Sequence, residues 1–285
     1  MTESSLRLPD GRTLAYQVDG APDVDRVVMF VPGFMACRLT GRPAAGARIV
    51  TADRPGIGSS DAKNGRSLLD FVDDVTALAD HLEIDRFAVL GHSAGAPYAA
   101  AIARRRPDRV TALGIACGFA PLNRPDATAG MHPRMARGMT GLQRAPWTAR
   151  LATTSLPRQY RKDPDKAFHR QFGQFLCQSD TAALQDPETR AALLAAATES
   201  TRQGAAALAA EMQIVFGLPW GFEPCDITVR TSLWYGADDR LTPPQMGDFL
   251  AAQIPNAKLV VFPGEGHMAA FTHWEEIVTN LGRDS

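Results

Sequence analysis

The sequence lacks any apolar run long enough to cross a membrane. No stretch approaches the roughly 18 apolar residues of a membrane span, and the N-terminal stretch MTESSLRLPDG has no apolar core of the kind that signal peptides carry. The formal net charge is only -1, so the chain has no basic field that would attract nucleic acid or anionic lipid. We therefore expect a cytoplasmic protein with no membrane span and no nucleic-acid partner.

Cysteine is also scarce. The chain has 4 cysteines in 285 residues, and no two form a CxxC pair: Cys37, Cys117, Cys177 and Cys225. Wide spacing of this kind favours buried free thiols in a reducing compartment over disulfides or a zinc site. His, Asp and Glu show no metal-ligand spacing, and GIGSSD lacks the GxGxxG pattern of dinucleotide-binding loops. We expect neither a metal nor a cofactor.

What the chain does contain is an alternation of apolar strands and amphipathic helices. Continuous apolar runs predict buried strands over 26–31 and 47–52. Apolar residues at helical spacing predict a helix over 68–82, and a strand, a helix and a strand follow over 87–117. Strands that alternate with helices are joined by right-handed crossovers, so the pattern predicts an α/β fold around a mostly parallel sheet.

Residues 119–223 differ in composition from the rest. This segment has no convincing strand and is rich in Ala, Met, Arg and Gln, with prolines that interrupt its helical stretches. The strand pattern resumes at 231–236 and ends at 257–262. We therefore predict a core domain made of residues 1–118 and 224–285, with a helical cap (lid) of residues 119–223 inserted after the sixth strand.

The stretch VLGHSAGAPY places one serine between two glycines, directly after a predicted strand and before a predicted helix. GHSAG fits the GxSxG pattern of a nucleophilic serine on a sharp turn. Such a turn strains the backbone of the serine and brings neighbouring segments too close for a side chain, which explains the glycines. It also lifts the hydroxyl of Ser93 above the sheet, next to the first amides of a helix. Ser93 is therefore the predicted nucleophile.

A serine hydroxyl needs a base, and the base needs an acid that orients it. His267, in FPGEGHMAAF, follows the last strand, and we expect it to be the base. Asp238 and Asp239, in YGADDRLTPP, follow the strand before it. Adjacent residues point in different directions, so only one of the two aspartates can face the histidine, and the residues alone leave open which.

Four stretches together resemble the α/β-hydrolase superfamily, in its capped, intracellular, esterase-like branch: DRPGIGSSD, GHSAGAPYAAAIARRRPDRV, LWYGADDRLTPP and PGEGH. The resemblance covers almost the whole chain outside the insertion. It implies the α/β-hydrolase fold, with a mostly parallel central sheet flanked by helices. In that family the acid usually stands three residues after the glycine that ends its strand, which implies Asp239.

The resemblance also implies an oxyanion hole made of the backbone N–H groups of Phe34 and Ala94. In FVPGFMACR, Pro32 stands where the family usually has a histidine that braces this loop, and the departure bears on the conformation of the loop. The turn that holds Asp53 and Arg54, after the fourth strand, is expected to be structural rather than substrate-binding.

The implied activity is that of a serine hydrolase that cleaves an ester, lactone or thioester of a small to medium apolar molecule through an acyl-enzyme. The same triad also serves carbon–carbon bond hydrolases and perhydrolases, which the sequence does not separate from esterases. A non-catalytic ligand-binding homologue and a cofactor-free oxygenase are further alternatives. A small-molecule substrate is the expected partner, and a homodimer is left open.

The substrate pocket is expected to be lined mainly by apolar side chains of the insertion and of the predicted loops. The predicted lining residues are Met35, His92, Met131, Met135, Trp147, Trp220 and Met268. Further candidates from the insertion are Met139, Phe172 and Phe175. Such a pocket suits an acyl chain or an aromatic group.

Overall fold

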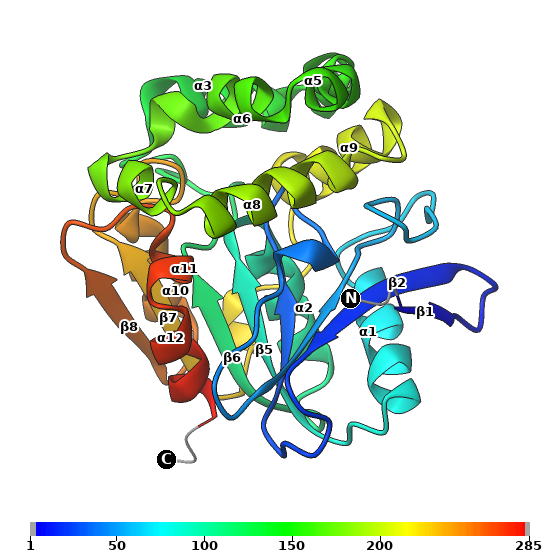
Figure 1. The fold of residues 1–285 in the computed structure, drawn as a ribbon. Coiled ribbons are helices and arrows are strands. Elements are labelled where there is room, and N and C mark those ends of the chain that lie inside the picture. Colours follow the sequence, from blue (N-terminus) through cyan, green and yellow to red (C-terminus); the bar gives the residue numbers. More distant parts are fainter. Residues whose placement is uncertain (1–3, 283–285) are drawn as a thin grey trace.

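The computed structural model of the protein describes residues 4–282, which fold around one eight-stranded sheet (Figure 1). Its strands are β1 (Ser4–Arg7), β2 (Thr13–Asp19), β3 (Val27–Val31), β4 (Arg48–Ala52), β5 (Phe87–His92), β6 (Val110–Ala116), β7 (Thr231–Gly236) and β8 (Ala257–Phe262). Their order across the sheet is β1-β2-β4-β3-β5-β6-β7-β8. β2 pairs antiparallel with β1 and β4, whereas all neighbouring pairs from β4 to β8 are parallel. The predicted mostly parallel sheet is confirmed.

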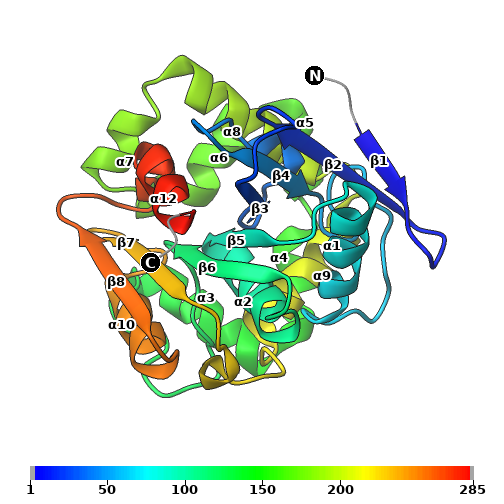
Figure 2. The same cartoon turned by 90° about the horizontal axis from the view of Figure 1, so that it is seen from below.

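Helices cover both faces of this sheet (Figure 2). Alternate residues of a strand face opposite sides, so Met29 of β3 packs in one apolar cluster with α1 (Asp70–His81) and α2 (Ala96–Arg105). Its neighbour Phe30 packs in a second cluster with α12 (Trp274–Leu281). Because both faces are covered, β3 is buried along its whole length, which is why its sequence is apolar at every position.

The helix α1 shows how local sequence sets these elements. Its buried stripe includes Phe71 and Leu78, at the spacing expected for one face of a helix. The backbone N–H and the hydroxyl of Ser67 both donate to Oδ2 of Asp70, at 2.8 Å each, just before the helix begins. The predicted helix in this region is confirmed.

Between β6 and β7 the described chain forms helices and turns only. The helices are α3 (Pro133–Arg144), α4 (Ala149–Thr153), α5 (Leu156–Lys162), α6 (Pro164–Phe172), α7 (Gln178–Ala183), α8 (Pro187–Ser200) and α9 (Ala205–Met212). Three of them, α3, α6 and α8, begin with a proline, whose fixed φ suits the first helical turn. The side chains of Asp163 and Asp186 accept a backbone N–H as the N-caps of α6 and α8.

The helices of this segment lie over the carboxyl end of the sheet, and appear in green and yellow in Figure 1. We call residues 119–223 the cap segment. The segment supplies helices where the sequence predicted an insertion, and its standing as a domain separate from the core stays a prediction. Its position places its side chains opposite the loops that follow β3, β5, β7 and β8.

Two further helices, α10 (Pro244–Gln253) and α11 (Ala269–Thr272), precede α12. No helix among residues 4–282 is long and apolar enough to cross a membrane. Cys37 and Cys117 are buried free thiols as expected, but Cys177 is half-buried and Cys225 is exposed. The prediction of a buried thiol is wrong for Cys225 because this residue lies in a short surface turn, Pro224–Asp226, ahead of β7.

Two glycine substitutions test how closely this fold is packed. Gly95 lies in the turn between β5 and α2, where a Cβ atom would overlap the carbonyl oxygen of Val31. Gly95→Ala should therefore lower the free energy of unfolding by about 3 kcal/mol or more. Gly138 lies in α3 with nothing within 4 Å of the position of a Cβ atom, so Gly138→Ala should raise that free energy by about 0.5–1 kcal/mol. Urea unfolding followed by circular dichroism measures both, and a tolerated Gly95→Ala would contradict the close approach.

Candidate active site

Ser93 stands on a strained turn at the end of β5. Its φ is 54°, in the left-handed region that residues other than glycine rarely adopt. The flanking glycines permit the turn, since a Cβ atom on Gly91 would lie 2.7 Å from the Cα of Ala96, and one on Gly95 would overlap backbone of the β3 loop. The serine hydroxyl is thereby presented at the start of α2, at the carboxyl edge of the sheet.

The structure brings Ser93, His267 and Asp239 into one hydrogen-bonded row. Oγ of Ser93 lies 3.1 Å from Nε2 of His267, and Nδ1 of the same ring lies 2.8 Å from Oδ2 of Asp239. Asp239 follows β7 and His267 follows β8. Of the two adjacent aspartates, Asp238 is exposed to solvent, whereas Asp239 is buried at 2% exposure and faces the imidazole.

The loop after β7 holds the Asp239 carboxylate in place. Its Oδ1 accepts the backbone N–H groups of Leu241 and Thr242, at 2.8 and 3.0 Å. Its Oδ2 lies 2.7 Å from the Thr242 hydroxyl in addition to the histidine. These donors fix the carboxylate in direction. Its Oδ2 accepts the proton on Nδ1 of the imidazole, so Nε2 is left to accept one from Ser93.

The two histidines of this region have opposite electrostatic environments. Burial alone would lower the pKa of His267, but the negative charge of Asp239 outweighs it and raises that pKa above the ordinary value of 6.5. Burial and repulsion from His267 instead bring the pKa of His92 well below 6.5. The two rings lie 5.0 Å apart, centroid to centroid, so His92 is a neutral neighbour of the row at physiological pH.

The loop after β3 passes directly over the serine. A Cβ atom on Gly33 would lie 2.9 Å from Cβ and 3.3 Å from Oγ of Ser93, so only glycine allows this approach. The next residue, Phe34, begins the part of the loop that lines the cavity described below. Phe34 follows Gly33 and Ala94 follows Ser93 in the chain, and the role of their backbone N–H groups as an oxyanion hole stays a prediction.

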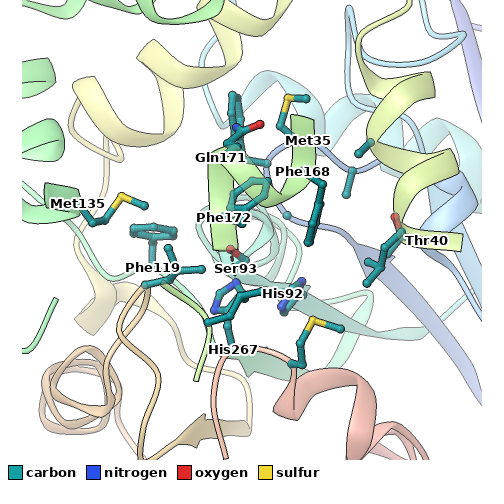
Figure 3. Close-up of a pocket in the computed structure, with 18 of the residues that line it drawn as sticks. Met35, Thr40, His92, Ser93, Phe119, Met135, Phe168, Gln171, Phe172 and His267 are labelled. Carbon is teal, nitrogen blue, oxygen red and sulfur yellow. Dashed lines mark hydrogen bonds between the residues drawn. The ribbon is translucent and has the colours of Figure 1, made fainter. Parts of the chain in front are cut away.

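A cavity of about 260 Å³ opens above this row, between the sheet and the cap segment (Figure 3). Sulfur and aromatic side chains dominate its wall. The methionines are Met35, Met135, Met139, Met212 and Met268, and the phenylalanines are Phe34, Phe119, Phe168, Phe172, Phe216 and Phe271. Besides Ser93 and the two histidines, Thr40 and Gln171 add polar groups, and none of the described lining residues is an arginine or a lysine.

The structure separates the predicted pocket residues into two groups. Met35, His92, Met135, Met139, Phe172 and Met268 line the cavity. The others lie elsewhere: Met131 and Phe175 are buried outside the wall, Trp220 packs on Phe222, and Trp147 is 64% exposed. The expectation is corrected for these four, because composition marks a residue as apolar without telling which way its side chain points.

Several lining residues were not predicted, among them Phe119, Phe168, Met212, Phe216 and Phe271. Phe119 lies three residues after the end of β6. Its position at the carboxyl edge of the sheet could therefore have marked it as a pocket residue. Phe168 lies one helical turn before Phe172 in α6, and this spacing also marks a shared face. The remaining three carry no comparable signal in the sequence.

One set of side chains could also be considered as metal ligands. Among the described residues, Cys117, Asp239 and His267 each place a ligand atom within 4.8 Å of the other two. Burial raises the pKa of the Cys117 thiol well above 9.0, so the thiol stays protonated, and a metal needs the thiolate. The Asp239 oxygen and His267 Nδ1 already share a hydrogen bond. This donor set therefore fits a hydrogen-bonded acid and base better than a metal.

Comparison with known proteins agrees with this geometry. Residues 26–273 match the family described as alpha/beta hydrolase fold. The chain belongs to this family. The sequence prediction of an enzyme with the α/β-hydrolase fold is thereby confirmed.

Individual relatives of this α/β-hydrolase carry different names. A 2-hydroxy-6-oxononadienedioate/2-hydroxy-6-oxononatrienedioate hydrolase of Cupriavidus pinatubonensis is 30% identical over 244 residues, which span 81% of this chain and 73% of that protein. A pimeloyl-acyl-carrier protein methyl ester esterase of Aromatoleum aromaticum is 29% identical over 246 residues, spanning 84% and 87%. The solved enol-lactonase of Burkholderia xenovorans LB400 has a TM-score of 0.72 at 18% identity and covers 98% of both chains, which shows a shared fold.

A matched pair of substitutions tests which aspartate serves the histidine. Asp239→Asn should lower kcat by about 10⁴-fold, because the amide favours the wrong tautomer of His267. Asp238→Asn changes the exposed neighbour and should leave kcat within about threefold, since surface polar groups without a buried partner contribute little. Steady-state kinetics on an ester that the wild type cleaves measures both, with folding checked by circular dichroism. A large loss of kcat in Asp238→Asn, with Asp239→Asn little changed, would show that Asp238 is the acid.

The raised pKa of His267 predicts the pH dependence of activity. The ring must be neutral to take the proton of Ser93, so kcat/KM should fall as the pH drops through that pKa, with an inflection above 6.5. The pKa of His92 lies well below 6.5, so this ring adds no second inflection above that pH. In Asp239→Asn the attraction that raises the pKa is gone, and burial should move the inflection below 6.5. A rate profile from about pH 5 to 9 that is flat for the wild type would exclude His267 as the base.

Proposed function

We propose that the protein is a serine hydrolase that cleaves esters of neutral, apolar molecules, with Ser93, His267 and Asp239 as its catalytic triad. The observation that carries this proposal is the row of hydrogen bonds, 3.1 and 2.8 Å long, at the base of a cavity with an apolar wall. Serine becomes a good nucleophile only beside such an oriented base. The membership in the α/β-hydrolase family supports the same reading.

In the proposed reaction Oγ of Ser93 attacks the acyl carbon while Nε2 of His267 takes the serine proton. The Asp239 carboxylate stabilises the imidazolium that forms. The carbonyl oxygen becomes an oxyanion, which accepts hydrogen bonds from the backbone N–H groups of Phe34 and Ala94. His267 then gives its proton to the departing alcohol, and water attacks the acyl-enzyme by the same steps to release the acid.

The wall of the cavity supports an apolar substrate class. Six phenylalanines and five methionines offer a flexible apolar surface that suits an acyl chain or an aromatic ring. A charged substrate would lose its hydration there without gaining a charged partner, which costs several kcal/mol. A volume of about 260 Å³ accommodates a small to medium molecule. The substrate is therefore uncharged near the scissile bond and on the side that enters the cavity.

A carbon–carbon bond hydrolase is the second candidate, since the Cupriavidus relative is named for a dienedioate, a substrate that has two carboxylates and no ester. Two carboxylates in a closed cavity call for arginine or lysine partners. The described lining residues include neither. We therefore place the ester ahead of the dienedioate, in line with the Aromatoleum relative named as a methyl ester esterase.

A substrate panel tests this assignment. Aryl esters of graded chain length should be hydrolysed, with kcat/KM rising from acetyl to medium acyl chains as more apolar surface is buried. A 2-hydroxy-6-oxo-dienedioate should be turned over poorly or not at all. Lactones and acyl-thioesters complete the panel, and turnover under argon separates hydrolysis from an oxygenase reaction.

Ser93→Ala is the matched control for this panel. It should keep the fold and lower turnover by about 10⁶-fold on every substrate that the wild type cleaves. Retained activity in this variant would exclude the mechanism. Preferred turnover of the dienedioate by the wild type would instead favour the carbon–carbon bond hydrolase with the same triad.

A further inference from the structure

The turn after β4 carries a buried arginine that does not line the cavity but contacts the loop above Ser93. Arg54 is 1% exposed. Its Nη1 donates to the carbonyl oxygen of Pro32 at 2.5 Å, and its Nη2 donates to the carbonyl oxygen of Gly33 at 2.9 Å. Both carbonyls belong to the loop that is predicted to supply the oxyanion donor Phe34. One planar guanidinium therefore holds two successive peptide units of this loop.

The second of these contacts acts on the oxyanion donor itself. The carbonyl of Gly33 and the N–H of Phe34 belong to the same peptide unit, which is planar and trans. A trans unit directs its C=O and N–H to opposite sides, so a carbonyl held by Arg54 turns the Phe34 N–H away from the guanidinium. Gly33 also makes close contact with Ser93, since a Cβ atom there would lie 2.9 Å from the serine Cβ.

We propose that Arg54 is a positioning residue for the oxyanion hole, a role that rests on the proposed serine-hydrolase function. It fixes the plane of the Gly33–Phe34 peptide and, through a charge-assisted hydrogen bond to the carbonyl, makes the Phe34 N–H a stronger donor. This role explains how the loop keeps its conformation with Pro32 in the place of the family's bracing histidine. Proline supplies no N–H, but its carbonyl is one of the two that the arginine holds.

A residue of the cap segment holds Arg54 in this position. Nε of Arg54 donates to Oε1 of Glu211 in α9 at 2.6 Å, and Glu211 is fully buried. The other oxygen of Glu211 accepts from Arg66 and, at 2.8 Å, from the hydroxyl of Tyr98. Burial would raise the pKa of the Glu211 carboxyl, but the two guanidinium groups outweigh it and lower that pKa. The carboxylate therefore stays ionised and orients Arg54.

This arrangement links the cap to catalysis. The residue after Glu211 is Met212, which lines the cavity, so the same helix end touches both the substrate space and the arginine behind the oxyanion loop. Two guanidinium groups share one carboxylate, so the cluster keeps one positive charge behind the loop, on the side opposite the developing oxyanion, where it polarises the intervening peptide.

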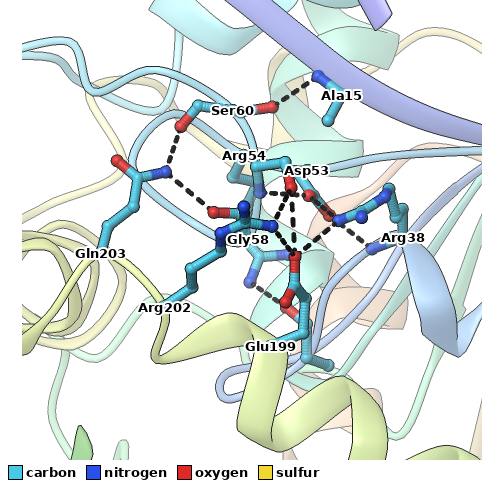
Figure 4. A network of polar contacts seen from close by, with 11 residues as sticks. Ala15, Arg38, Asp53, Arg54, Gly58, Ser60, Glu199, Arg202 and Gln203 are labelled. Atoms are coloured by element: carbon cyan, nitrogen blue, oxygen red, sulfur yellow. Dashed lines mark hydrogen bonds and ion pairs between the residues drawn. The ribbon is translucent and has the colours of Figure 1, made fainter. Parts of the chain in front are cut away.

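The chain offers a matched control in Arg38. This arginine is also buried, and its Nη1 pairs with Asp53 at 2.6 Å and with Glu199 of the cap segment at 3.2 Å (Figure 4). Arg38 and Arg54 thus both link the core to a cap carboxylate. The bonds to the carbonyl oxygens of Pro32 and Gly33 are made by Arg54.

The test compares Arg54→Lys with Arg38→Lys in their affinity for two inhibitors. An alkyl trifluoromethyl ketone forms an oxyanion with a nucleophilic serine, and the matching secondary alcohol fills the same space without forming one. Endpoint titration with a fluorophosphonate counts the intact sites in each preparation. Lysine keeps the charge but cannot hold both carbonyls and Glu211 at once.

Arg54→Lys should weaken ketone binding by about 10- to 100-fold and lower kcat per titrated site by a similar factor, less than the roughly 10²–10³-fold cost of losing an oxyanion donor outright. Alcohol binding and KM should change by less than about threefold, because they do not involve the oxyanion. Arg38→Lys should leave the ratio of the two affinities unchanged. If Arg54→Lys does not fold, Glu211→Gln should shift the same ratio in the same direction by a smaller factor.

An unchanged ratio in Arg54→Lys, or in Glu211→Gln if that variant is the one that folds, would overturn the proposal. An equal shift in Arg38→Lys would do so as well, because the effect would then be general to buried arginines. Failure of the serine-hydrolase function itself gives a different result. In that case the wild type would bind the ketone no more tightly than the alcohol.

Discussion

Three backbone segments meet at Ser93 with no room for a side chain between them, and the site depends on this close approach. Gly33 brings the β3 loop against the serine, and Gly91 and Gly95 let β5 turn sharply into α2. The serine itself has a φ of 54°, a strain of about 1–3 kcal/mol that persists only when the surroundings enforce it. The surrounding parallel strands are buried on both faces and make this part of the structure rigid. They thereby fix the relative positions of the Ser93 hydroxyl, the Phe34 amide and the His267 imidazole.

The distribution of charge follows from the same arrangement. The cavity wall is apolar, while the ionised groups of the site stand behind the reacting atoms: Asp239 behind His267, and Arg54 with Glu211 behind the oxyanion loop. Each buried charge has several hydrogen-bond partners, so it is stable where it lies. Beside an apolar cavity such fixed charges act on the transition state and need no rearrangement during the reaction.

The sequence predicted the parts of the site that local pattern controls. The GxSxG turn and the strand ends identified the positions that the structure brings together, while the choice of Asp239 over Asp238 came only from the family resemblance. The pocket wall was predicted only in part, because the apolar character of Trp147 or Trp220 does not tell which way its side chain points. Arg54 was expected to be structural, and its partner Glu211 lies 157 positions away, a distance that no local pattern spans.

In the proposed mechanism the reaction passes through an acyl group on Ser93. An aryl carbamate tests it most directly, because the carbamoyl-enzyme forms by the same attack and hydrolyses slowly enough to be isolated. After a rapid acid quench, intact-protein and peptide mass spectrometry should show one carbamoyl group per chain, located on Ser93, with an equal amount of released phenol. Phenol release without a modified Ser93, or with the group on another residue, would contradict the mechanism.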